Sequence, residues 1–136
     1  LAEQGEARLA VRLAELVALA RKAGQAVAGF EKTKDALISG GAVLLLQAAD
    51  GSERERARLR PPEGENSLVS CLLGHELGLA FARDRVIHAA VLAGGLGDRI
   101  RNEGLRLSGI RITTNQHTSV DVAGNVSAGE GLRGKG

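Results

Sequence analysis

The feature that most constrains this chain is a run of five apolar residues, 42–46, that contains no polar position. A strand that alternates apolar and polar residues keeps one face in water, whereas a strand without alternation is covered on both faces. Gly40-Gly41 precedes the run, and Asp50-Gly51 turns the chain after it. The sequence therefore predicts an inner strand with a layer of structure on each side.

Helical and strand-like patterns alternate along the rest of the chain. The clearest helix is predicted over residues 5–23, where apolar residues recur at helical spacing along one stripe. Strands that alternate with helices indicate an α/β fold with helices on both faces of the sheet. The other predicted elements are strands at 25–28, 68–72 and 85–91 and helices at 30–39, 53–59, 75–82 and 96–107.

The apolar pattern ends after Ser108, and residues 113–136 are polar and rich in glycine. We therefore expect one domain over residues 5–110, followed by a flexible C-terminal tail over residues 111–136. The chain does not begin with Met, which favours a fragment of a longer protein. It shows no signal-peptide pattern and no apolar run of about 20 residues, so we expect a cytoplasmic protein without a membrane partner.

Composition limits the modes of recognition that are open to the chain. The only aromatic residues are Phe30 and Phe81, which excludes a surface that stacks several bases on exposed rings. A single cysteine, Cys71, excludes an internal disulfide and a zinc cluster built on cysteines. The net charge is +2, too small to indicate nucleic-acid binding without a local concentration of charge.

No residue pattern indicates catalysis or metal binding. His75-Glu76 resembles the start of an HExxH zinc helix, but the position that needs the second histidine is Leu79. His88 lies inside an apolar strand pattern and is expected to be structural. Cys71 is expected to be an inert thiol in the core, because activation requires a nearby base or positive charge. We expect no catalytic residue, no metal, no cofactor and no enzymatic activity.

One segment at a predicted strand-to-helix junction could hold an anion. Gly29 lets the backbone approach another molecule closely, and the first-turn amides of the following helix point outward as donors. Lys32 and Lys34 lie in that first turn, where positive charge opposes the helix dipole unless an anion binds there. The alternative, a solvated helix start with Glu31 and Asp35 compensating the lysines, is equally compatible with the residues.

The order of several short motifs resembles the kink-turn RNA-binding ribosomal-protein superfamily, in particular its bacterial YlxQ-like branch. The resemblance covers residues 7–107 and rests on LARKAG, VAG, ALISGGA, AAD and ELGLA, which begin at residues 19, 27, 36, 48 and 76. The segments at 85–90 and 106–109 resemble proteins in which this domain follows a YlxR-type (DUF448) domain. Such proteins are predicted to bind nucleic acid and are linked to transcription termination.

The resemblance implies a three-layer α/β/α sandwich around a four-stranded mixed sheet. It also implies an RNA surface formed by the first turn of the second helix and by the loop between the third strand and the fourth helix. The family signature there is Gly-x-Asn-Glu-x-x-Lys, which begins at Gly29 in this chain. Glu31 stands at the Asn, Lys32 at the Glu and Asp35 at the Lys. All three chemical roles are changed, so binding to a kink-turn in the family's pose would cost free energy.

We expect a non-enzymatic module for structured RNA with an altered kink-turn signature, related to the ribosome or to transcription termination. An upstream YlxR-type domain is a possible partner in the longer protein. The alternative is a protein–protein interaction domain that has lost RNA binding and uses Phe30 and Leu72-Leu73 as its apolar contact. The expected RNA-binding residues are Gly29, Phe30, Glu31, Lys32, Lys34, Asp35, Leu72, Leu73, Gly74 and His75.

Overall fold

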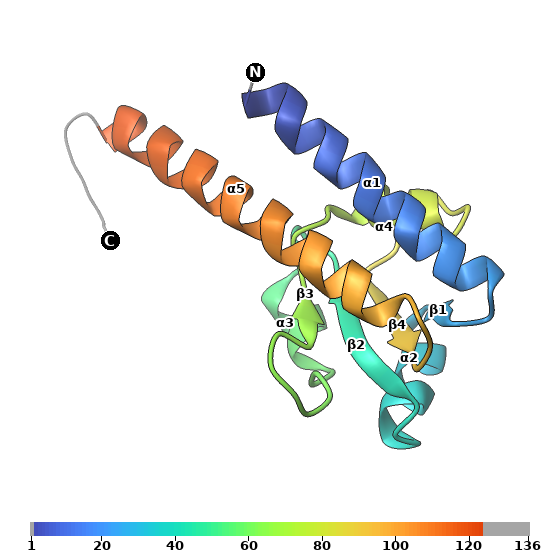
Figure 1. Ribbon diagram of the computed structural model, residues 1–136. Coiled ribbons are helices and arrows are strands. Elements are labelled where there is room, and N and C mark those ends of the chain that lie inside the picture. The colour runs from blue at the N-terminus through green and yellow to red at the C-terminus, as the bar shows by residue number, and fades with distance from the viewer. Residues whose placement is uncertain (1, 124–136) are drawn as a thin grey trace.

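The computed structural model describes residues 2–123, with side chains from residue 5 to residue 111. Five helices and four strands alternate along this part of the chain (Figure 1). The elements are α1 (Ala2–Lys22), β1 (Ala26–Ala28), α2 (Phe30–Ile38), β2 (Ala42–Gln47), α3 (Glu53–Ala57), β3 (Leu68–Val69), α4 (Gly74–Ala80), β4 (His88–Leu92) and α5 (Gly97–Ala123).

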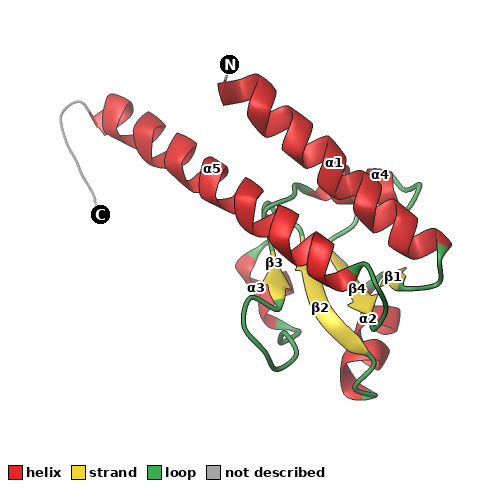
Figure 2. Cartoon of the chain, in the orientation of Figure 1, coloured by secondary structure: helices red, strands yellow, loops and turns green. Residues whose placement is uncertain are grey.

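The strands form one mixed sheet in the order β1-β4-β2-β3. The last strand in the sequence, β4, lies between β1 and β2 and is antiparallel to both, whereas β3 is parallel to β2. Helices α1, α4 and α5 cover one face of the sheet, and α2 and α3 lie on the other (Figure 2). The predicted three-layer α/β/α fold around a four-stranded mixed sheet is confirmed.

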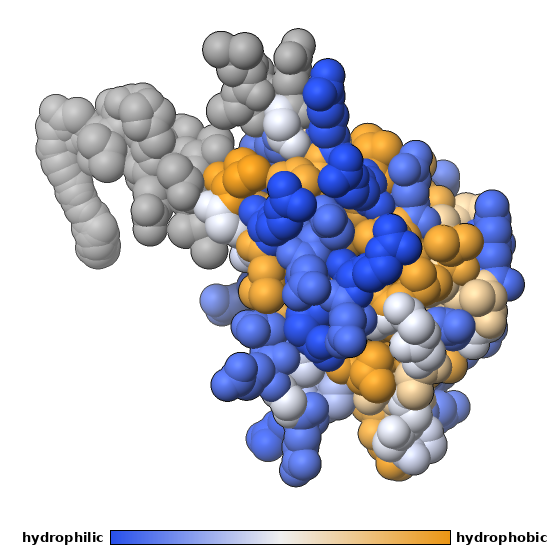
Figure 3. Space-filling model, in the orientation of Figure 1, coloured by the Kyte–Doolittle hydropathy of each residue, from blue (hydrophilic) through white to orange (hydrophobic). Residues whose placement is uncertain are grey.

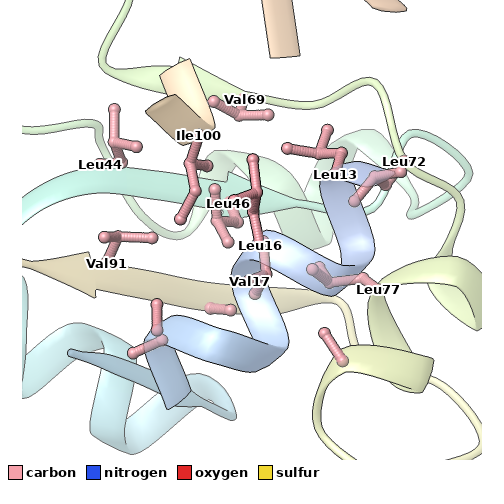
Figure 4. Packing of buried hydrophobic residues seen from close by; sticks show 14 of the residues in the cluster. Leu13, Leu16, Val17, Leu44, Leu46, Val69, Leu72, Leu77, Val91 and Ile100 are labelled. Atoms are coloured by element: carbon pink, nitrogen blue, oxygen red, sulfur yellow. The ribbon is translucent and has the colours of Figure 1, made fainter. Parts of the chain in front are cut away.

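The inner strand β2 is covered on both faces, as its sequence predicts. Leu44, Leu45 and Leu46 are each at most 2% exposed, although successive side chains of a strand point to opposite faces. On the face of α1 and α5, Leu13 and Ile100 pack with Leu44 and Leu46 in the main core (Figure 4). Burying each of these side chains stabilises the fold by roughly 2 kcal/mol.

Two strands differ in length from their predicted ranges. The predicted strand at 68–72 pairs with β2 only at Leu68 and Val69, and the predicted strand at 85–91 begins three residues later, at His88. The apolar residues beyond these limits are buried without being paired: Leu72 and Val86 belong to the core cluster. Hydrophobic composition therefore indicated burial at these positions, and not strand pairing.

The prediction that helical structure ends near Ser108 is wrong, because α5 continues to Ala123. Residues 111–123 of the predicted tail are therefore helical, and residues 124–136 lie outside the described residues. At Arg111, two ion pairs join the helix to its neighbours, one with Glu6 of α1 and one with Glu76 of α4. Hydrophilic residues gather along α5 on the face shown in Figure 3, as expected for the outer surface of a layer.

Candidate nucleic-acid interface

Four connections meet at one end of the sheet, which we call the loop end. Ala28 of β1 pairs with Ala89 of β4, and Gln47 of β2 pairs with His88. Strands β1 and β2 therefore finish where β4 begins, and β3 runs in the same direction as β2. The β1–α2, β2–α3, β3–α4 and α4–β4 connections consequently share this end, which brings both predicted RNA-binding segments to one side of the molecule.

Gly29 occupies the junction between β1 and α2 in a conformation that favours glycine. Its φ is +99°, and its N–H donates to the carbonyl oxygen of His88 over 2.9 Å. A Cβ atom on Gly29 would lie 3.6 Å from Nη1 of Arg83, which comes from the α4–β4 loop. As the N-cap residue it has no side chain to bond the first amides of α2, so these donors remain available to a ligand.

The charged side chains at the start of α2 are all exposed. In the part of the chain that the structure describes, Glu31, Lys32, Lys34 and Asp35 form no ion pair. The two carboxylates therefore do not neutralise the lysines by direct contact. All four side chains are solvated and Glu31 lies in the first turn, so the geometry leaves both interpretations of this helix start open.

Phe30 is half-buried, which differs from the exposed aromatic contact that the protein-interaction alternative requires. Its ring meets the ring of His88 edge to face, with centroids 5.7 Å apart. The guanidinium carbon of Arg58 lies 3.8 Å from the ring centroid, and Nζ of Lys34 lies 5.9 Å from it. The ring is thus a platform for two cations.

His88 is buried beneath Phe30 and has a structural role, as its strand position predicts. Burial lowers the pKa of His88 below its ordinary value of 6.5, and the charge of Glu55 opposes this only in part. The ring is therefore neutral at pH 7. Its Nδ1 lies 3.4 Å from Nε2 of Gln47, which donates to the carbonyl oxygen of Arg56 over 2.9 Å. These contacts tie α2, β4 and α3 together.

The second predicted segment, 72–75, is mostly inaccessible. The Leu72 side chain is 3% exposed, Gly74 is buried and Leu73 is half-buried, so only His75 of the four is exposed. The N–H of Leu73 donates to Oε1 of Glu76 over 2.8 Å. The prediction that Leu72 and Gly74 line a contact surface is therefore wrong, because an apolar pair in a loop can equally be part of the core.

A single carboxylate, Asp50, holds three of the loops together. Its Oδ1 accepts from the N–H of Gly74 at 2.8 Å, and its Oδ2 accepts from Nη1 of Arg85 at 3.0 Å. Nη2 of Arg85 also donates to the carbonyl oxygen of Asp50. The hydrogen bonds from Gly74 and from Arg85 lower the pKa of Asp50 below its ordinary range. Asp50 and Arg85 therefore organise the loop end and neutralise each other there.

The α4–β4 loop, which lies beside Gly29, was not predicted as part of the site. Arg83 in this loop is exposed and forms no ion pair within the described residues. The loop packs closely on α4 at Gly78, where a Cβ atom would lie 2.5 Å from the carbonyl oxygen of Arg83. The sequence does show two arginines, Arg83 and Arg85, in the loop after α4. Only the tertiary structure, however, places Arg83 beside Gly29.

A second polar cluster, behind the β3–α4 connection, is structural. Arg111 donates to Glu6 and, through both terminal nitrogens, to Glu76; it also donates to the carbonyl oxygen of Cys71. Burial alone would raise the pKa of Glu76, but hydrogen bonds from Arg111 and from the Leu73 N–H outweigh it and lower the pKa. Because Arg111 belongs to α5 and its partners Glu6 and Glu76 belong to α1 and α4, this cluster joins the three helices.

Cys71 should react slowly with thiol reagents while the protein is folded. Burial raises the pKa of its thiol to about 11 from an ordinary 9.0, and Sγ donates to the carbonyl oxygen of Gly104. At pH 8, this rise in pKa by itself lowers the fraction of Cys71 present as thiolate about 100-fold. We expect reaction with a disulfide reagent at pH 8 to be at least about 100-fold slower in the folded protein than in guanidinium. Rates that differ by less than about tenfold would show an activated thiol.

Two further classes of site find no support in the described residues. Among residues 5–111, whose side chains the structure describes, no group of three or more His, Cys, Asp or Glu side chains is placed to hold a metal ion. The same part of the chain has no helix that is both long enough and apolar enough to cross a membrane.

Comparison with known proteins supports the fold alone. No family model matches the sequence, and no curated protein matches it. The solved structure of a protein with unknown function from Bacillus halodurans C is similar to this chain, with a TM-score of 0.57 at 19% sequence identity. The match covers 69% of this chain and 97% of that protein. At this identity the similarity extends to the arrangement of helices and strands.

Proposed function

We propose that this domain is a non-enzymatic module that binds structured RNA at the loop end. The observation that carries the proposal is the set of exposed cations without carboxylate partners among the described residues, Lys32, Lys34 and Arg83, around a glycine junction. Lys32 comes from the first turn of α2 and Lys34 from the start of the second, and Arg83 lies beside Gly29. Cations and free helix amides together are the groups that bind phosphates.

Backbone geometry supports the same site. The N–H of Thr33 donates to the carbonyl oxygen of Gly29, so the amides of residues 30–32 precede the first hydrogen-bonded turn of α2. Gly29 caps this end without a side chain. An RNA phosphate at this position would accept from the amides while Arg83 approaches from the adjacent loop.

Carboxylates at the same surface limit the affinity and alter the specificity. Glu31 and Asp35 are exposed at signature positions where the kink-turn family has Asn and Lys. Their charge repels phosphates, so we infer weak binding to structured RNA and little preference for tandem G·A pairs. The family resemblance supports a ribosomal or transcription-termination RNA, a cytoplasmic location and an upstream YlxR-type domain.

The competing function, a protein-interaction domain, loses the contact on which it was based. Leu72 is buried and Phe30 is covered by Arg58 and His88. Neither residue offers the exposed apolar area that a protein interface needs at its centre. RNA binding is therefore the function that the loop end supports best.

Titration of labelled RNAs tests this proposal. We expect a kink-turn RNA, and the same RNA without its G·A pairs, to bind with similar low affinity. Arg83→Ala should weaken the binding of both RNAs about fivefold. It should also reduce the slope of log affinity against log salt concentration by about one. Arg99→Ala is the matched control, because Arg99 is exposed in α5 at the opposite end of the sheet and forms no described ion pair.

The results can contradict the proposal in two ways. Strong preference for the RNA with G·A pairs would show that the family's recognition survives the changed signature. Equal losses with Arg83→Ala and Arg99→Ala would show that RNA binds to positive charge in general, with no site at the loop end.

A further inference from the structure

An open groove of about 530 Å³ lies between α2 and the segment that follows α3. Helices α2 and α3 lie on the face of the sheet opposite α1 and α5 (Figure 2). The α2 side of the groove is formed by residues spaced one and two turns apart, so they share one face of the helix. This face is distinct from the one that carries Lys32. The apolar lining residues are Phe30, Leu37, Ile38 and Leu59, and the polar ones are Lys34, Arg58 and Arg60.

The rim of this groove is entirely basic. Among the described lining residues there are three cations and no carboxylate, and none of the three forms an ion pair with a described carboxylate. This differs from the protein as a whole, which has 18 basic and 16 acidic side chains. Positive charge is therefore concentrated at this groove, and a ligand that neutralises it must carry negative charge.

The floor of the groove is aliphatic and partly open to water. Ile38 is 73% exposed, and Leu37 and Leu59 are half-buried. An RNA base would need an open ring for stacking, but Arg58 already covers the face of Phe30 at 3.8 Å. An aliphatic floor favours an apolar side chain from a protein instead.

We propose that this groove binds an acidic peptide segment of a partner protein. Apolar side chains of the peptide contact Leu37, Ile38 and Leu59. Carboxylates of the peptide face Lys34, Arg58 and Arg60. The proposal rests on charge complementarity together with the exposed aliphatic floor. The groove shares Phe30 and Lys34 with the proposed RNA site, whereas Ile38, Leu59 and Arg60 belong to the groove alone. A bound peptide that neutralises Lys34 removes one cation from the start of α2.

Labelled synthetic peptides test the proposal with the full chain. The probe is a fluorescein-labelled peptide of about ten residues that mixes Asp and Leu. One control peptide has Lys in place of Asp, and another has Ser in place of Leu. We expect the Asp/Leu peptide to bind at least about tenfold more tightly than either control, because both charge and apolar contact are required. Its addition should shift the backbone amide resonances of residues 34–38 and 58–60.

Paired variants locate the binding. Ile38→Ser and Arg60→Glu should each lower the affinity for the Asp/Leu peptide about tenfold or more. Their matched controls are Leu79→Ser, since Leu79 is 70% exposed on α4, and Arg99→Glu on α5. Neither control should change the affinity by more than about twofold, and Arg83→Ala, which tests the RNA site, should leave the peptide affinity unchanged.

Three outcomes would overturn the proposal. The first is no binding of the Asp/Leu peptide at millimolar concentration. The second is equal loss of affinity in the groove variants and in their controls. The third is a shift of the groove resonances by RNA and not by the peptide, which would make the groove an extension of the RNA surface.

Discussion

Gly78→Ala should destabilise the protein by about 3 kcal/mol or more, which is a large fraction of the stability of a domain of this size. A Cβ atom at this position would lie 2.5 Å from the carbonyl oxygen of Arg83 and 3.0 Å from the backbone N of Arg85. Both neighbours are backbone atoms, so no side-chain rotation relieves the contact. The whole α4–β4 loop would have to move away from α4.

The hydrogen bonds around Gly78 increase the expected effect. Its carbonyl oxygen accepts from the N–H of Arg83 and from the N–H of Phe81, each at 3.0 Å. Ala82, between these donors, has a φ of +55°, which a residue with a side chain seldom adopts. Displacing the loop would break the bond from Arg83 and also move its side chain away from Gly29.

Equilibrium unfolding in guanidinium measures this effect, and Gly5→Ala is the matched control. A Cβ atom on Gly5 of α1 would have no neighbour from the rest of the protein within 4 Å. Alanine there should therefore be neutral or stabilise the helix by up to about 1 kcal/mol. If Gly78→Ala unfolded at the same denaturant concentration as the wild type, the close packing of the α4–β4 loop on α4 would be wrong.

Arg111→Met should destabilise the protein by about 3 kcal/mol at pH 7. The substitution keeps much of the apolar stem and removes the charge, which leaves the carboxylates of Glu6 and Glu76 without their partner. Their side chains are 26% and 17% exposed, and that of Arg111 is 17% exposed, so water replaces the lost bonds poorly. The effect is at the lower end of the range for buried ion pairs because these groups are not fully enclosed.

The effect of Arg111→Met should depend on pH. Glu76 has a lower pKa in the folded protein than its ordinary value of 4.5, so the unfolded chain takes up the proton first as the pH falls. The stabilisation from this pair is therefore complete above about pH 5 and is lost as the pH falls through the folded pKa. We expect the difference between wild type and Arg111→Met, measured by urea unfolding, to shrink steadily below about pH 4.5.

Arg106→Met provides the control in the same helix. Arg106 pairs with Glu103 at 3.6 Å, but its side chain is 63% exposed. An exposed pair of this kind contributes at most about 0.5 kcal/mol. Equal losses in the two variants, or a loss in Arg111→Met that stays constant from neutral to acidic pH, would contradict the structural role of the Arg111 cluster.

Local patterns in the sequence predicted an α/β fold with helices on both faces of a sheet, and the family resemblance supplied the four-stranded mixed sheet. The apolar run at 42–46 predicted a strand covered on both faces, and Leu44, Leu45 and Leu46 are buried as expected. Ser52 and Glu55 form a capping box at the start of α3, with reciprocal hydrogen bonds. Such features depend on residues a few positions apart, so the sequence displays them directly.

The parts that the sequence did not predict depend on residues far apart in the chain. Arg111 joins α5 to α1 and α4 through partners 105 and 35 positions away, and no local pattern marked this position as helical. Arg83 reaches Gly29 because Gly78 admits its loop backbone, a contact between separate elements. Leu72 was expected at the surface because the family resemblance places the loop between the third strand and the fourth helix in the RNA site, although the core includes it. The fold was therefore more predictable than the site.

The position of β4 in the sheet has a consequence for synthesis on the ribosome. Within the described sheet β1 pairs with β4, and β4 is the last strand in the sequence. The first strand thus has no neighbour in the described sheet until residues 88–92 have left the exit tunnel. Until then its hydrogen-bonding groups remain without a strand partner. Folding of this domain consequently follows translation of β4, and a chain that stops before His88 cannot form the central pairing of the sheet.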